Sequence, residues 1–163
     1  MHRCFLRRVR IGLVVAGLAA GASCSRSTAE AHALLDEYGA MFAAVASSGS
    51  VDRTGLLERL EELGKHAHAL RAADRIDQRF AARYERLLTV ARLLITRSQT
   101  WEGVAMDPAI TAFVREVTGR PLPPNARGFA VVAPAIVEEM LSLRMLLDRT
   151  SDREAARARY LPK

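Results

Sequence analysis

The stretch DRIDQRFAARYERLLTVARLLI, residues 74–95, decides the fold class of this chain. Apolar side chains recur in it every three or four positions, at Ile76, Phe80, Tyr84, Leu87, Leu88, Ala91, Leu94 and Ile95. That spacing places them on one face of an α-helix, which has about 3.6 residues per turn, whereas a half-buried strand would alternate polar and apolar residues. We therefore predict a helix that begins near Asp74 and buries one side.

The same periodicity extends toward the N-terminus of this stretch. It predicts one helix over residues 34–45, which the small polar residues at 47–50 end, and another helix over residues 56–70. Both carry apolar residues at three- and four-residue spacing, so each is expected to bury one face against a neighbouring helix.

Two further helices are predicted on the C-terminal side. Residues 107–108, Asp-Pro, are a typical helix start and Gly119 is a typical stop, which indicates a short helix over residues 108–118. Apolar spacing indicates a longer helix over residues 136–147, with Pro134 either in its first turn or at a kink.

A last short helix is predicted to begin at a capping pair, Ser151 with Glu154, and to end at Leu161. No stretch of residues 24–163 shows the alternation of polar and apolar side chains that is typical of a strand. The expected fold is all-α, an antiparallel helical bundle of four main helices plus short helices, in a single domain over residues 28–163.

The first 23 residues have the composition of a secretory signal. Four arginines and no acid precede an uncharged apolar stretch at residues 11–22, and small residues close it. A dozen helical residues span about 18 Å, less than the roughly 30 Å of bilayer hydrocarbon, which argues against a transmembrane helix. The alternative is an ordinary core helix at the start of the fold, but the stretch has no polar residues to mark a solvent face.

Residues 21–24, Gly-Ala-Ser-Cys, resemble the lipobox of bacterial lipoproteins, with Gly21 where that family usually has leucine. The resemblance implies that residues 1–23 are removed and that Cys24 becomes the first residue, carrying fatty-acyl chains such as palmitate. It also implies, from Ser25, sorting to the outer membrane with the domain facing the periplasm. The alternative is plain secretion, with cleavage after the A-x-A pattern of residues 20–22.

Cysteine usage favours lipidation over plain secretion. The other cysteine, Cys4, lies in the signal, so the mature chain would keep one thiol, Cys24, in a compartment that oxidises thiols. Acylation would make that thiol a modification site, rather than a free thiol exposed to oxidation. Residues 24–27 would then be a short tether. Its three residues after Cys24 reach about 10 Å, so the bundle would be held against the membrane surface.

The distribution of charge argues against nucleic-acid binding. The whole chain carries a net charge of +6, but four of its 24 basic residues lie in the signal, which leaves 20 basic and 18 acidic residues. The basic excess is therefore largely a property of the signal, and the mature chain has no compositional footprint of a nucleic-acid-binding protein.

A stripe of arginines is the most ordered charge pattern of the mature chain. On one continuous helix it would occupy an arc of about 120°, at Arg71, Arg75, Arg79, Arg83 and Arg86. One interpretation is contact with an anionic partner, such as lipid phosphates or an acidic helix. The other is a solvated flank, or a flank paired with the preceding helix through Glu58, Glu61 and Glu62.

The histidines and carboxylates do not complete a metal site. Glu58, Glu62 and His66 share one helix face, but His68 points away from it and His32 lies far along the chain. Because a zinc site normally needs three or four ligands, we predict no metal. The haem-attachment motif is also missing, so no cofactor is expected.

Catalytic motifs are missing from the sequence too. Ser47 and Ser48 lie in a turn without a nucleophile-elbow pattern, and the adjacent Glu138 and Glu139 would diverge by about 100° on a helix. We therefore expect no catalytic residues and no enzymatic activity.

Two residues in connectors between helices are candidate contact points with a partner. Trp101 is one, although the alternative is that its side chain fills the core, and Arg127, which follows a proline-rich segment, is the other.

The expected function is that of a lipid-anchored accessory protein that binds another component of the cell envelope, and the expected partner is a protein. One alternative is a bundle that holds a lipid or apolar small molecule. A second is a metal-dependent or hydrolytic enzyme built on Glu62 and His66.

Overall fold

The computed structural model describes residues 27–43, 52–97, 107–122 and 129–161, and within these ranges every regular element is a helix. The first helix covers residues 27–43. The others are α2 (Arg53–Ala72), α3 (Gln78–Arg97), α4 (Pro108–Thr118), α5 (Phe129–Asp148) and α6 (Arg153–Tyr160). The all-α fold predicted from apolar spacing is confirmed.

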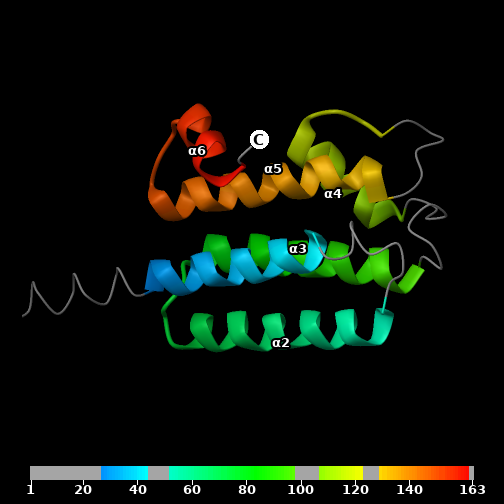
Figure 1. The fold of residues 1–163 in the computed structure, drawn as a ribbon, viewed down its shortest axis with the longest axis horizontal. Coiled ribbons are helices and arrows are strands. Elements are labelled where there is room, and N and C mark those ends of the chain that lie inside the picture. The colour runs from blue at the N-terminus through cyan, green and yellow to red at the C-terminus, as the bar shows by residue number, and fades with distance from the viewer. Residues whose placement is uncertain (1–26, 44–51, 98–106, 123–128, 162–163) are drawn as a thin grey trace, which may run out of the picture.

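The four long helices form an antiparallel bundle (Figure 1). Helix 27–43 and α3 run in the same direction through the middle of the molecule, and α2 and α5 run in the opposite direction on either side of them. The short helices α4 and α6 pack on α5, and α4 also contacts α3. As a result, α5 has neighbours on several sides, and it contributes both to the buried charges around Glu139 and to the apolar groove described in the next subsection.

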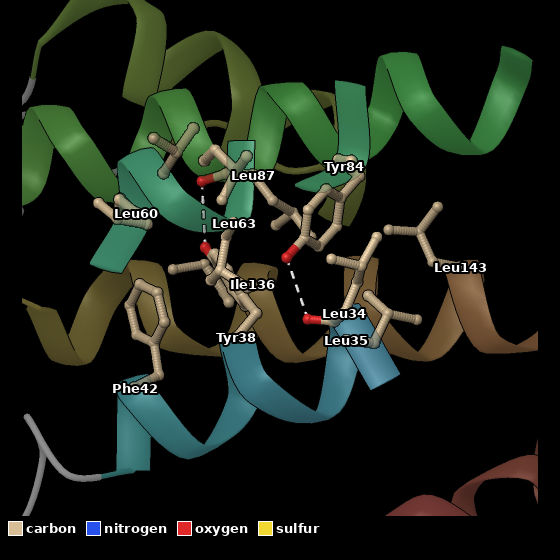
Figure 2. Close-up of a cluster of buried hydrophobic side chains, with 14 of the residues drawn as sticks. Leu34, Leu35, Tyr38, Phe42, Leu60, Leu63, Tyr84, Leu87, Ile136 and Leu143 are labelled. Carbon is tan, nitrogen blue, oxygen red and sulfur yellow. Dashed lines mark hydrogen bonds between the residues drawn. The ribbon is translucent and has the colours of Figure 1, made fainter. Parts of the chain in front are cut away.

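Two buried tyrosines set the register between helix 27–43 and α3 (Figure 2). The Tyr38 hydroxyl donates to the carbonyl of Leu87 at 3.1 Å, and the Tyr84 hydroxyl donates to the carbonyl of Leu34 at 3.0 Å. Burial raises the pKa of both phenols well above the usual value, so both stay neutral donors in the folded protein. The two bonds satisfy polar groups that the apolar core would otherwise leave unpaired.

The start of α3 differs from the prediction. The helix begins at Gln78 rather than near Asp74, because the chain first turns between α2 and α3 and Asp74 adopts a left-handed backbone with φ of 54°. Asp77 caps α3 instead, since its Oδ1 accepts from the backbone N–H groups of Arg79 at 2.7 Å and Phe80 at 3.3 Å.

The other predicted helix ends are confirmed in one case and corrected in another. Asp107 caps α4, and Gly119 ends it in the left-handed conformation with φ of 69°, as expected. α6 begins one residue later than predicted, with Asp152 rather than Ser151 as its cap. Pro134 lies inside α5, which extends upstream to Phe129.

None of the helices in the described ranges is both long enough and apolar enough to cross a bilayer. Cys24, Trp101 and Arg127 lie outside the described residues, so lipidation and the two connector contacts stay predictions.

Candidate functional site

The predicted arginine stripe is divided between two helices. Arg71 lies in the last turn of α2, Arg75 lies in the turn that follows, and the other three arginines lie on α3. The predicted arc of arginines requires one continuous helix, whereas the chain reverses direction after Ala72. The five side chains therefore do not form a single helical face.

Four of the five stripe arginines form ion pairs within the chain. Arg71 contacts Glu85 at 3.5 Å, and Arg75 contacts Glu30 of helix 27–43. Arg83 and Arg86 both contact Glu139 of α5, and Arg79 is exposed. The carboxylates expected as partners, Glu58, Glu61 and Glu62, do not supply these contacts.

The most buried charge among the described residues is Glu139, whose side chain is 3% exposed. Arg83 binds it in fork geometry, with Nε to Oε1 at 2.9 Å and Nη2 to Oε2 at 2.6 Å, and Arg86 adds a contact at 3.2 Å. Two cations offset the cost of removing this carboxylate from water. Arg83 also donates to the Ser142 hydroxyl at 2.9 Å.

Arg86 extends this group of charges to α4. It contacts Glu116 at 2.6 Å and lies 5.5 Å from the centre of the Phe113 ring. The hydrogen bond from Arg86 to Glu116 raises the pKa of Arg86 and lowers the pKa of Glu116. We call Arg83, Arg86, Glu116, Glu139 and Ser142 the Glu139 cluster; it links α3, α4 and α5.

Glu138 and Glu139 diverge, as their adjacency on a helix requires. Glu138 contacts Arg153 and Arg157 of α6, whereas Glu139 faces α3. The two carboxylates therefore do not act as a pair. Sequence reasoning did not identify Glu139 as buried, because its arginine partners lie more than fifty positions away.

Within the described ranges, no group of three or more histidine, cysteine, aspartate or glutamate side chains is placed to hold a metal ion. Glu58, Glu62 and His66 are exposed on α2. His32 lies elsewhere and contacts Asp148 through Nε2 at 3.0 Å.

An apolar groove of about 480 Å³ lies between helix 27–43, α5 and α6. Its apolar lining includes Phe42, Ala43, Ile136, Val137, Met140 and Leu161. Val137 and Leu161 are 38% and 40% exposed, and they are the exposed large apolar side chains of the described residues. Their presence in one groove makes it, among the surfaces of the described residues, the one on which burial by a ligand would be most favourable.

Gly39 contributes to the groove by lacking a side chain. A Cβ atom at this position would lie 3.0 Å from the Met140 methyl carbon, closer than nine in ten such contacts in proteins. Glycine in the middle of helix 27–43 weakens the helix but lets α5 approach it at the groove.

A polar rim closes one end of the groove. Arg144 contacts Asp36 at 2.5 Å and lies 4.6 Å from the centre of the Tyr160 ring. The Tyr160 hydroxyl in turn donates to Asp148 at 2.6 Å, and His32 contacts the other oxygen of the same carboxylate. These contacts join α6 to both walls of the groove.

The contacts around Asp148 also shift its acidity. Burial opposes ionisation, but the hydrogen bonds from Tyr160 and His32, together with the charges of His32 and Arg159, lower the pKa of Asp148 overall. Burial and the bond to Asp148 raise the pKa of Tyr160. The ionised carboxylate and the neutral phenol are therefore the forms that the fold favours.

The groove was not predicted from the sequence, because its residues on α5 follow the same apolar spacing as core residues. Gly39, inside an otherwise regular helix, was the available signal of a close approach.

Comparisons with protein-family models, curated proteins and solved structures find no match to this chain. Its function therefore has to be inferred from the chemistry of the site.

Proposed function

We propose that this protein is a lipid-anchored component of the bacterial cell envelope that holds an apolar small molecule, such as a lipid, in the groove. The volume of about 480 Å³ falls within the range of roughly 300–1,000 Å³ that is typical of ligand pockets. An apolar lining with a few polar groups at one end is also typical of such pockets. The lipobox-like segment supports the anchor.

The observation that carries this proposal is the exposure of Val137 and Leu161 within one concave surface. Isolated exposed apolar side chains are common, but two that line the same groove are a favourable surface for an apolar molecule. The arginine stripe is weaker support for a binding surface, because four of its five cations already have partners in the chain.

A ligand-binding assay tests the groove. The mature chain with Cys24→Ala, exported through a plain secretion signal, carries no acyl chain of its own and keeps every described residue. We expect it to bind the neutral fluorophore Nile red, and we expect Val137→Glu to weaken binding at least tenfold because a carboxylate in an apolar groove is costly. Fluorescence titration measures both affinities.

Ala112→Glu is the matched control, because Ala112 is exposed on α4 and does not line the groove. Equal weakening by both substitutions, or no binding by the parent chain, would contradict the proposal. Mass spectrometry of the native N-terminus tests the anchor separately: acylated Cys24 supports it, and an unmodified Ser23 terminus contradicts it.

An envelope protein that inserts an apolar side chain into the groove is the second candidate, favoured by the same exposed residues. A photo-crosslinker at Val137 distinguishes the two in intact cells. Crosslinks to a lipid support the ligand proposal, and crosslinks to one protein support the partner.

A further inference from the structure

We infer that the ligand of the groove has an acidic head group, a carboxylate or a phosphate, on an apolar tail, and that Arg144 binds this head group. The inference rests on the proposed function, since it requires the groove to be a ligand site. It adds the chemical class of the ligand and the residue that recognises it.

Arg144 is a cation held at the groove with a replaceable partner. Its side chain is 12% exposed, so most of its hydration is lost, yet its partner Asp36 is 67% exposed. The contact joins one guanidinium nitrogen, Nη2, to one carboxylate oxygen at 2.5 Å. An arginine has five N–H donors in a planar fork, so this single bond leaves most of its donor capacity for a ligand.

Arg83, whose ion pair holds two helices together, differs from Arg144 in how its carboxylate partner is placed. Arg83 is more exposed than Arg144, at 32%, but it binds a nearly inaccessible carboxylate through two parallel hydrogen bonds. At Arg144 the cation is mostly but not fully buried, and the acid is mostly in solvent. An incoming carboxylate or phosphate can therefore replace Asp36, because an ion pair with one exposed partner contributes little stability.

Tyr160 holds the guanidinium in place for this exchange. The ring lies 4.6 Å from the guanidinium carbon, and its hydroxyl is bound to Asp148, so the platform is itself fixed. Arginine over an aromatic face is a favourable cation–π arrangement. Because the fork is already oriented, less conformational entropy is lost when it binds an anion.

The path of the groove supplies room for the tail. Ala133, Val137, Met140 and Arg144 succeed one another along one face of α5, over a length of about 16 Å. Arg144 lies at one end, and the other end is apolar, with Ala43 and Phe42 on the opposite helix. An elongated amphiphile with its head at Arg144 matches this order of polar and apolar groups.

Three amphiphiles with the same tail test the inference on the unacylated mature chain: dodecanoate, dodecyl phosphate and dodecanol, each titrated by displacement of Nile red. We expect at least one of the two acids to bind about tenfold tighter than dodecanol, as expected for a charge-assisted hydrogen bond. The tighter of the two acids identifies the head group as carboxylate or phosphate.

Substitutions then assign the preference to Arg144. We expect Arg144→Gln to remove the preference for the acid while dodecanol binding stays within about twofold, and Arg144→Lys to retain part of it. Asp36→Asn should strengthen acid binding severalfold, because it removes the competing carboxylate. Arg115→Gln, an exposed arginine on α4, is the control and should change nothing.

The outcomes separate the two proposals. If dodecanol binds as tightly as both acids, or if Arg144→Gln keeps the acid preference, the head-group inference is wrong while the groove remains a ligand site. If none of the three amphiphiles binds, the proposed function itself fails.

Discussion

On the side of α5 that faces α3 and α4, a carboxylate is buried and two arginines surround it. On the side that faces helix 27–43, an arginine is mostly buried and its carboxylate partner Asp36 is mostly in solvent. The Glu139 cluster thus has its charges matched inside the protein, and loss of the Glu139 carboxylate would leave Arg83 without an ion-pair partner among the described residues and Arg86 with Glu116 alone. The groove instead has a cation whose carboxylate partner is mostly in solvent, beside apolar surface. One helix therefore has a side suited to stability and a side suited to binding.

The largest expected effect comes from the Glu139 cluster. Glu139→Ala leaves Arg83 and Arg86 without their shared partner between α3 and α5, which should lower the free energy of unfolding by about 3 kcal/mol. Urea denaturation followed by circular dichroism measures this loss. Glu138→Ala is the matched control, because Glu138 contacts the exposed arginines of α6, and it should cost about 1 kcal/mol or less. Equal losses would remove the distinction between the two neighbours.

A smaller effect is expected where α6 meets the groove. Tyr160→Phe removes the hydrogen bond to Asp148 and should destabilise the docking of α6 by about 1 kcal/mol. Hydrogen exchange should then accelerate at the amides of α6 and not at those of α3. Uniform acceleration throughout the bundle would show that Tyr160 supports the whole fold and not the groove alone.

The same contact predicts a pH dependence. The folded protein lowers the pKa of Asp148, so the stabilisation by its carboxylate is present above the unfolded pKa and is lost as the pH falls below about 4. The raised pKa of Tyr160 means that the stabilisation by its phenol is present below about pH 10 and is lost as the pH rises above that value. The protection factors of the α6 amides, which compare each exchange rate with the intrinsic rate at the same pH, should therefore be highest between these limits, and in Tyr160→Phe the alkaline limit should vanish.

The smallest effect on stability is expected inside the groove itself. Ala43 is exposed on helix 27–43 and lines the groove, so Ala43→Phe fills the groove without displacing the core. We expect the free energy of unfolding to change by about 0.5 kcal/mol or less, while Nile red affinity falls at least tenfold. A large loss of stability would mean that this side of α5 is as tightly packed as the side that holds Glu139.

Local sequence signals predicted the helices well where the controlling contacts lie within one helical turn. Asp107, Pro108 and Gly119 predicted both ends of α4, because a cap and a left-handed stop act on neighbouring backbone groups. The start of α3 was misplaced by one turn, because both Asp74 and Asp77 are plausible caps and the path of the chain after α2 selects between them.

The sequence by itself determined that the chain is helical and which face of each helix is apolar, because helix periodicity and capping depend on residues a few positions apart. Tertiary structure alone decided which charges are paired and where apolar surface stays open. Arg83 meets Glu139 and Asp36 meets Arg144 only after helices distant in sequence pack together. Apolar spacing looks the same on a helix face that is covered and on one that lines a groove, so the groove follows from packing and not from pattern.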